Sequence, residues 1–270
     1  MQTVKVDDVT FGYKILGQGY PLVLIMGYGS TMDMWDSRVL TKLASRFQVI
    51  IFDNRGMGSS TASDKEFSID LFAEDTAGLF NALNIKKANI LGFSMGTNIA
   101  LEFTLRYPEM VNKLILYAGD CGGKESLKPQ EGVMKQLTDT SCTSEERTHK
   151  MINLIFPDKW LKDNLGSLKD LPKVTETSSP EIVDRQTKAM MTWEGCCGRL
   201  KDLTLPVLLI TGTEDVLTPP KNSLLLANCI PLACLVQIEG AGHGLMYQYP
   251  EEFTKHIFVF LQSSEKEQKR

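Results

Sequence analysis

The feature that most constrains this fold is the repeated alternation of short apolar runs with helical patterns. The strand-like runs are almost entirely apolar and lie at 21–26, 48–52, 88–93, 113–117, 206–211 and 232–238. Helical patterns follow at 69–83, where Ser68 is a plausible N-cap, and at 97–106, 220–227 and 250–261. Short apolar strands separated by helices are typical of a mainly parallel sheet with helices on both faces. The sequence therefore predicts an α/β fold.

Two segments depart from this alternation. Residues 3–9 and 11–16 read as strands without a helix between them. Between Asp120 and about Lys201 the alternation stops, and the segment is rich in Lys, Thr, Ser and Met with helical patches. A structureless loop of that length is uncommon in a compact domain. We therefore expect a small helical insertion there.

Composition and charge restrict the function. Hydrophobic residues make up 43% of the 270 residues, enough for one sizeable core. The 29 Lys and Arg residues against 33 Asp and Glu residues give a net charge of −4, which argues against a nucleic-acid partner. No apolar run approaches the ~20 residues of a membrane-spanning helix, and the N-terminus has no signal-peptide core. We expect a cytoplasmic protein without a membrane partner.

The six cysteines show no Cys-x-x-Cys pair. A cytoplasmic setting favours free thiols. A metal site could be assembled from Cys121, Cys142, Cys196 and Cys197, but their spacings follow no zinc pattern, and we expect no metal. The adjacent Cys196 and Cys197 could be a redox pair. We favour the simpler interpretation, that they are small residues in a glycine-flanked turn.

A serine stands in a sharp turn between a predicted strand and a predicted helix. Residues 92–96 read G-F-S-M-G. The glycines on either side of the serine remove side chains that would clash in so tight a bend. Such a turn exposes Ser94 Oγ above the carboxyl end of the sheet, at a helix N-terminus whose dipole favours negative charge. The motif alone could be an ordinary turn, but in this position it indicates a nucleophilic serine.

A nucleophilic serine needs a base, and the chain has three histidines. His149 lies in the polar insertion and reads as a surface residue, and His256 lies within the predicted last helix. His243 lies in G-A-G-H-G, directly after the strand that ends near Ile238. A glycine-rich loop at that place can carry an imidazole over the sheet. We therefore identify His243 as the candidate base, with an uncommitted loop histidine as the alternative.

The base needs a carboxylate that orients it. Asp215 follows a strand in G-T-E-D-V-L-T-P, again at a carboxyl end. Asp120 follows the strand that ends near Tyr117 and is a rival, and Glu214 is a weaker one. We favour Asp215, because its turn is tighter and the order serine, acid, histidine is the one expected of a strand–serine–helix arrangement.

The last requirement is a pair of donors for a developing oxyanion. The N–H of Met95, directly after the serine, is one candidate. The N–H of Tyr28, in the M-G-Y-G-S loop at 26–30, is the other. Gly27 and Gly29 would let that backbone approach a substrate closely, although they could also form an ordinary glycine turn.

At this point the chain resembles the α/β-hydrolase superfamily. The resemblance covers nearly all of the chain outside the insertion and depends on five motifs in family order: M-G-Y-G-S (26–30), D-N-R-G-M-G-S-S (53–60), G-F-S-M-G (92–96), G-T-E-D-V-L-T-P (212–219) and G-A-G-H-G (240–244). It implies a mostly parallel, twisted sheet flanked by helices. Within the superfamily the chain is most similar to small serine esterases, enol-lactonases and cofactor-free haloperoxidases.

In that branch a helical cap is inserted after the sixth strand. The resemblance therefore implies a core of residues 1–120 and 201–270 and a cap of residues 121–200, with 185–193 similar to the cap's final helix. It also implies that Asp53 and Arg55 hold a turn beside the site rather than react. One departure is Met26, where many relatives carry His.

These residues predict a carboxylesterase- or lactonase-type hydrolase that cleaves a small ester, thioester or lactone through an acyl-Ser94 intermediate, without a cofactor. The alternatives are C–C bond hydrolysis of a diketone and a low-turnover ligand-binding protein of the same fold. We expect a small-molecule substrate and a monomer or homodimer. Apolar side chains of the insertion could line an acyl pocket or simply pack against the core: Phe156, Trp160, Met190, Met191 and Trp193.

Overall fold

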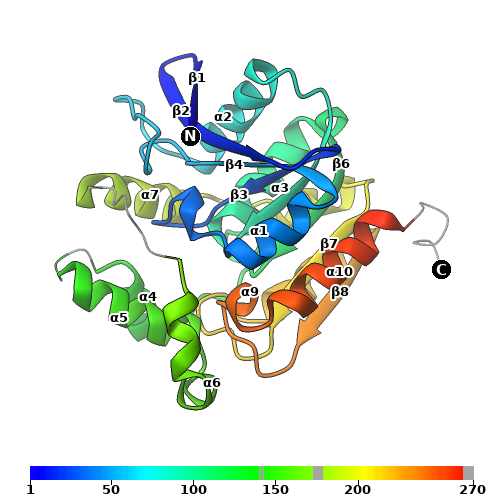
Figure 1. Ribbon diagram of the computed structural model, residues 1–270. Helices are drawn as coiled ribbons and strands as arrows, with labels where there is room; N and C mark the ends of the chain where they lie inside the picture. The colour runs from blue at the N-terminus through cyan, green and yellow to red at the C-terminus, as the bar shows by residue number, and fades with distance from the viewer. Residues whose placement is uncertain (140, 142, 173–178, 264–270) are drawn as a thin grey trace.

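The computed structural model describes residues 1–139, 141, 143–172 and 179–263 (Figure 1). Its strands are β1 (Gln2–Val6), β2 (Val9–Leu16), β3 (Tyr20–Ile25), β4 (Phe47–Phe52), β5 (Ala88–Phe93), β6 (Val111–Tyr117), β7 (Val207–Gly212) and β8 (Ala233–Ile238). Its α-helices are α1 (Ser37–Ala44), α2 (Ile69–Ala82), α3 (Met95–Arg106), α4 (Glu131–Leu137), α5 (Ser144–Ile155), α6 (Asp158–Asp163), α7 (Pro180–Thr192), α8 (Lys221–Cys229), α9 (Leu245–Gln248) and α10 (Pro250–Gln262). Short 3₁₀ helices lie at Met32–Met34, Pro108–Met110, Leu165–Asp170 and Cys197–Asp202. None of the helices in these ranges is both long and apolar enough to cross a membrane.

The described strands form one eight-stranded sheet in the order β1-β2-β4-β3-β5-β6-β7-β8. The pairs β1–β2 and β2–β4 are antiparallel, and every later pair is parallel. The predicted α/β fold with a mainly parallel sheet is confirmed. Because parallel strands end at the same edge, the residues after β5, β6, β7 and β8 meet at one side of the molecule.

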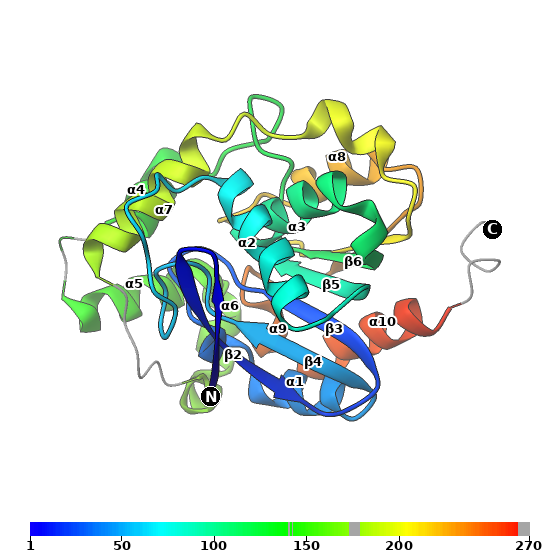
Figure 2. The ribbon, with the colours of Figure 1, turned by 90° about the horizontal axis from the view of Figure 1, so that it is seen from above.

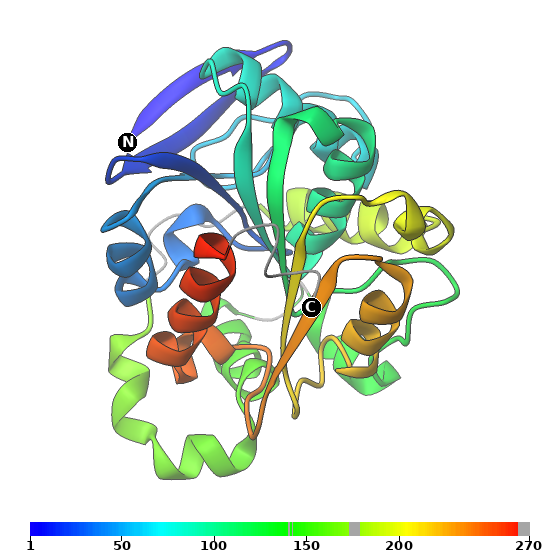
Figure 3. The same ribbon diagram turned by 90° about the vertical axis from the view of Figure 1, so that its right-hand side faces the viewer.

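Neighbouring residues of a central strand enter two different cores. Val23 and Ile25 of β3 pack in the cluster that contains the buried faces of α2 and α3, whereas Leu22 and Leu24 pack in the cluster that contains α1 and α10. Successive side chains of a strand point to opposite faces, so a continuous apolar run is what a sheet covered on both sides requires. Figure 3 shows α1 (blue) and α10 (red) together on one of these faces.

Local sequence signals explain where the core helices begin. Ser68 caps α2 by accepting a hydrogen bond from the Leu71 N–H at 3.0 Å, as predicted. Helix α1 was not predicted from the sequence; its N-cap Asp36 accepts from the N–H groups of Arg38 and Val39. The apolar face of α1 is too short to give a clear helical periodicity, so Asp36 as an N-cap was the one sequence signal that could have predicted this helix. The four-residue α9 was also missed.

Between β6 and β7 the described residues form helices α4 to α7 and short 3₁₀ turns, without a strand. We call residues 121–200 the cap segment. In Figures 1 and 2 its helices α4, α5 and α7 lie together at one end of the sheet. The division of the chain into a core of 1–120 and 201–270 and a separate cap remains a prediction.

The expectation of free thiols is wrong for two cysteines. Cys121 and Cys197 form a disulfide, with a Cα–Cα distance of 5.3 Å and a sequence separation of 76. Cys196 is free but buried, and burial raises the pKa of its thiol to about 12. The disulfide occupies two of the four sulfurs of the metal alternative, and Cys142 lies outside the described residues. It also joins the beginning of the cap segment to its end.

Candidate active site

Ser94 lies between the last residue of β5 and the first residue of α3, with φ at 55° and ψ at −122°. A positive φ is uncommon for a residue with a side chain and stores backbone strain. The flanking residues are glycines because a side chain would not fit. A Cβ atom added to Gly92 would overlap the carbonyl oxygen of Gly96, and one added to Gly96 would overlap the carbonyl oxygen of Ile25. The predicted strained turn is therefore present.

His243 lies in the loop after β8 and is hydrogen-bonded to Asp215, which follows β7. The distance from His243 Nδ1 to Asp215 Oδ2 is 2.8 Å, and both side chains are buried. Asp215 Oδ1 accepts from the backbone N–H groups of Leu217 and Thr218 at 2.9 and 2.8 Å. One oxygen thus fixes the carboxylate and the other is directed to the imidazole.

The rival residues are occupied elsewhere. Asp120 Oδ1 accepts from the N–H of Gly122 at 2.7 Å and from Asn98 Nδ2 at 3.1 Å, so this carboxylate holds the start of the cap segment. Glu214 is exposed. His149 is exposed and contacts Asn153 at 3.2 Å.

Aromatic packing places the His243 loop beside the serine turn. The His243 ring lies 5.0 Å from the ring of Phe93, the residue before Ser94. The Tyr117 hydroxyl donates to the His243 carbonyl at 2.5 Å, and burial raises the pKa of Tyr117 well above its ordinary value. Ser94 Oγ makes no hydrogen bond within the described part of the chain, His243 included. A serine–histidine contact often tightens only when substrate binds.

The loop that contains the predicted oxyanion donor lies against Ser94. A Cβ atom on Gly27 would come within 2.9 Å of Ser94 Cβ, so only a glycine permits this approach. Met95 is the first residue of α3, and its N–H therefore has no intrahelical acceptor. The roles of the Tyr28 and Met95 N–H groups remain predictions.

The cap segment braces this loop, which the sequence did not reveal. The Gly29 N–H donates to Gln186 Oε1 at 2.9 Å, and the Tyr28 hydroxyl lies 2.7 Å from Thr187 Oγ1. Both partners belong to α7. From the core, Asn54 Nδ2 donates to the carbonyl of Met26 at 2.9 Å. The loop is thus held from both sides without the histidine that many relatives carry at position 26.

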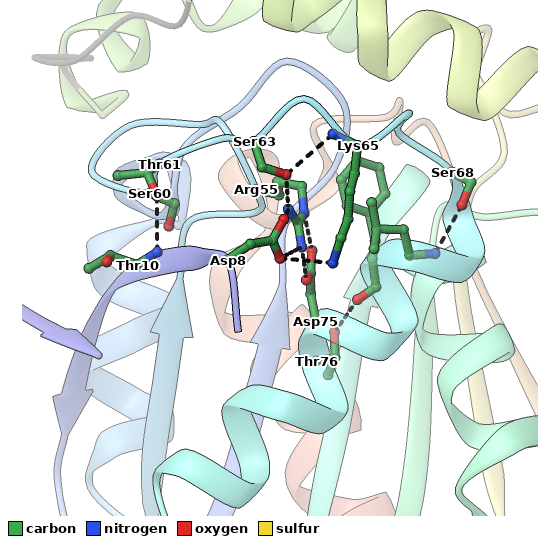
Figure 4. A network of polar contacts seen from close by, with 12 residues as sticks. Asp8, Thr10, Arg55, Ser60, Thr61, Ser63, Lys65, Ser68, Asp75 and Thr76 are labelled. Carbon is green, nitrogen blue, oxygen red and sulfur yellow. Dashed lines mark hydrogen bonds and ion pairs between the residues drawn. The ribbon is translucent and has the colours of Figure 1, made fainter. Parts of the chain in front are cut away.

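The D-N-R-G motif holds turns near the site, as the resemblance implied. Asp53 accepts from the N–H groups of Met32 at 2.6 Å and Ser59 at 2.9 Å. Arg55, only 1% exposed, binds the carboxylates of Asp75 and Asp8, and Figure 4 shows this network between α2 and the β1–β2 turn.

The proposed pocket side chains are packed in different surroundings. Trp160 is buried and stacks on Phe156 with ring centroids 4.7 Å apart. Trp193 is half-buried against Gly122, and Met190 packs against the core cluster of α2 and α3. Met191 is 69% exposed, so the suggestion that it lines a pocket is wrong. A substrate-pocket role for Trp160, Met190 and Trp193 remains a prediction.

Comparisons with known proteins define the class. Residues 20–160 match the family described as alpha/beta hydrolase fold, and residues 194–269 match one described as TAP-like protein. The chain therefore belongs to the α/β-hydrolase family.

Individual proteins resemble it over nearly their whole length. A protein of Azorhizobium caulinodans described as "Putative carbamate hydrolase RutD" is 27% identical over 94% of this chain and 95% of its own. The enol-lactonase of Burkholderia xenovorans LB400 superposes with a TM-score of 0.85 at 22% identity, covering 97% of this chain and 100% of the other. A thermophilic esterase of Thermogutta terrifontis gives 0.83 at 24% identity, covering 97% and 98%. At these identities the two structures show the fold alone.

Proposed function

We propose that the protein is a serine hydrolase that cleaves a small ester, thioester or lactone through an acyl-Ser94 intermediate. The observation that carries this proposal is the buried 2.8 Å hydrogen bond between His243 Nδ1 and Asp215 Oδ2, in a loop beside the turn that holds Ser94 at positive φ. A buried acid, a histidine and a serine at the carboxyl edge of one sheet supply a nucleophile, a base and an orienting group.

In this mechanism His243 takes the proton of Ser94 as the hydroxyl attacks the carbonyl carbon. Asp215 accepts from Nδ1–H, so Nε2 is left free to act as the base, and the same carboxylate stabilises the imidazolium that forms. The N–H groups of Tyr28 and Met95 stabilise the oxyanion. His243 then protonates the leaving group and activates water, which releases the acid and restores Ser94.

One relative supports acyl transfer as the reaction type. The Azorhizobium caulinodans protein is described as a putative carbamate hydrolase, and a carbamate is cleaved when a heteroatom leaves a carbonyl carbon. A triad and oxyanion donors are suited to that step.

The test is a panel of p-nitrophenyl esters, thioesters and lactones assayed on the wild type and Ser94→Ala in parallel. A fluorophosphonate probe should label the wild type and spare Ser94→Ala. Equal labelling of the two proteins, or equal turnover, would remove Ser94 from the mechanism. A wild type inactive on the whole panel would favour the ligand-binding alternative.

A further inference from the structure

A cationic side chain of the cap segment lies over the oxyanion loop. Among the described residues other than its chain neighbours, the one atom within 4 Å of a Cβ atom on Gly29 would be Nη2 of Arg147, at 3.4 Å. Arg147 belongs to α5 and is half-buried, and it forms no ion pair with any carboxylate whose side chain the structure describes, a set that leaves out Glu145. A guanidinium that is partly removed from water gains most from a carboxylate, which it can bind in a bidentate manner.

A second donor lies at the same glycine. The Gln186 side chain is fully buried, and its Oε1 accepts from the Gly29 N–H at 2.9 Å. This bond fixes the orientation of the amide, because a flipped group would set two donors against each other. The Nε2 group of Gln186 is buried without a hydrogen-bond partner among the described residues. Buried donors are normally satisfied, so this one keeps hydrogen-bonding capacity for an acceptor that reaches it when the groups covering it move.

Charged groups of both signs act on the Tyr28 loop, but they differ in burial. Burial is the main reason that the pKa of Tyr28 is raised, and Arg147 lowers this pKa while Asp184 raises it. Asp184 is exposed on α7. The partly desolvated charge beside Gly29 is therefore the positive one.

We propose that Arg147 and Gln186 form an anion-recognition subsite on the cap side of the oxyanion loop, and that the substrate is an ester or lactone that also carries a carboxylate. This inference rests on the proposed hydrolase function. Gly27 lies against Ser94, and Gly29 is two residues further along, a span of at most about 7 Å. The substrate carboxylate is thus a few bonds from the scissile carbonyl.

The experiment compares p-nitrophenyl hemiesters of succinate, glutarate and adipate with the same compounds blocked as methyl esters. For the wild type, kcat/KM should favour at least one free acid over its blocked partner by about tenfold or more, mainly through KM. Arg147→Gln should reduce this preference about tenfold, and Arg147→Lys should retain part of it. Lys162→Gln removes one positive charge from α6 instead and should leave the preference unchanged. An unaltered preference in Arg147→Gln would overturn the proposal.

A second variant separates the two roles of Gln186. Gln186→Glu keeps an oxygen acceptor for the Gly29 N–H but replaces the Nε2 donor by a negative oxygen. It should therefore reverse the preference, so that the blocked esters become the better substrates. If Gln186→Glu still favours the free acids, Nε2 does not contact the substrate anion.

Direct binding tests the subsite apart from catalysis. Calorimetric titration of glutarate into Ser94→Ala should show binding, and adding Arg147→Gln should weaken it about tenfold. This measurement does not depend on ester turnover. Failure of every ester with retained, Arg147-dependent glutarate binding would reject the hydrolase proposal and keep the subsite, whereas glutarate binding that is indifferent to Arg147 would reject the subsite.

Discussion

At the scale of single residues, the serine turn depends on two glycines as much as on the serine. A positive φ at a residue such as Ser94 costs about 1–3 kcal/mol and persists only when the surroundings enforce it. Gly92 and Gly96 allow the enforcing contacts, because β5, α3 and the end of β3 meet there without side chains between them.

Gly96→Ala is expected to destabilise the protein by roughly 3 kcal/mol or more and to abolish activity. The new Cβ would overlap the backbone of Ile25, and a backbone atom in a central strand cannot move aside cheaply. Gly132→Ala is the matched control, since a Cβ there would meet no described atom within 4 Å outside its own helix backbone and chain neighbours, and the residue is in α4. The control should be neutral or stabilise by up to about 1 kcal/mol. Urea denaturation of both variants checks this, and equal midpoints would contradict it.

Asp215→Asn is expected to lower kcat by roughly 10³–10⁴, by analogy with serine proteases. The substitution keeps the shape of the side chain but removes the charge that holds the His243 tautomer at 2.8 Å. Asp120→Asn should cost less than about tenfold, or ~1.4 kcal/mol, because this carboxylate binds Gly122 and Asn98 instead. Steady-state kinetics of both variants on one ester measures the two losses. A larger loss of kcat for Asp120→Asn would assign the orientation of His243 to Asp120 instead.

At the scale of elements, the cap segment is closed at its base and bound to the histidine loop. The disulfide joins its two ends, and the Cys196 N–H donates to the Cys121 carbonyl at 2.8 Å. At the far side, the Gly244 N–H donates to the Ile155 carbonyl at 2.7 Å, so the α5–α6 connection lies on the histidine loop.

Removing the disulfide should lower the free energy of unfolding by roughly 2–4 kcal/mol, since it closes a long loop in the unfolded chain. The test variant is Cys121→Ser combined with Cys197→Ser, followed by thermal denaturation. Cys234→Ser, at an exposed free cysteine, is the control and should change the melting temperature little. If the double variant is as stable as the control, the bond does not stabilise the fold.

The Arg55 network predicts a pH dependence of stability. The pKa of Asp8 lies well below the ordinary value of 3.8, mainly because the Asp8 carboxylate accepts a hydrogen bond from Arg55. A lowered pKa in the folded state adds stability that is complete above about pH 4 and is lost as the pH falls through the folded value. The pKa of Asp75 is shifted in the opposite direction, because burial raises it although Asp75 binds the same arginine.

Asp8→Asn should therefore destabilise the protein at pH 7, and its stability difference from the wild type should shrink as the pH falls below about 4. Asp75 is present in both proteins, but Asp8 raises its pKa, so the difference reports Asp8 together with this coupling. Denaturant titrations at pH 7, 5 and 3 measure the effect. A difference that stays constant down to pH 3 would exclude the ion pair as its source.

At the scale of the whole molecule, the cap segment contacts both loops that would act on a substrate. Thr187 and Gln186 hold the loop of Tyr28 and Gly29, and Ile155 holds the loop of His243. Movement of α5 or α7 would therefore change the site itself and not only access to it.

Tyr28→Phe and Thr187→Val should each reduce kcat, and the double variant should be no worse than the poorer single one. Both substitutions remove the same 2.7 Å hydrogen bond, so a coupling energy of about 0.5–1.5 kcal/mol is expected. Measuring kcat for the wild type, the two single variants and the double variant completes the double-mutant cycle. Strictly additive losses would mean that the bond does not brace the loop in solution.

The sequence by itself determined the alternation of strands and helices, the serine turn and the class of fold, because these follow from short-range patterns. The run 88–93 matches β5 to the residue, and Ser68 begins α2 where its side chain can cap it. It also ranked Asp215 above Asp120, although both follow strands at the same edge.

Tertiary structure decided what depends on distant parts of the chain meeting. Three examples are the 2.8 Å contact of Asp215 with His243, the Cys121–Cys197 disulfide and the hydrogen bond of Tyr28 with Thr187 of α7. The partners are separated in sequence by 28, 76 and 159 positions, respectively. Short-range patterns carry no information on such pairings, since each side chain looks ordinary in its own segment. The glycines of G-A-G-H-G show this: Gly242 leaves room for the Ile155 carbonyl and Gly244 for the Phe156 ring, two contacts with the cap segment that no local motif reveals.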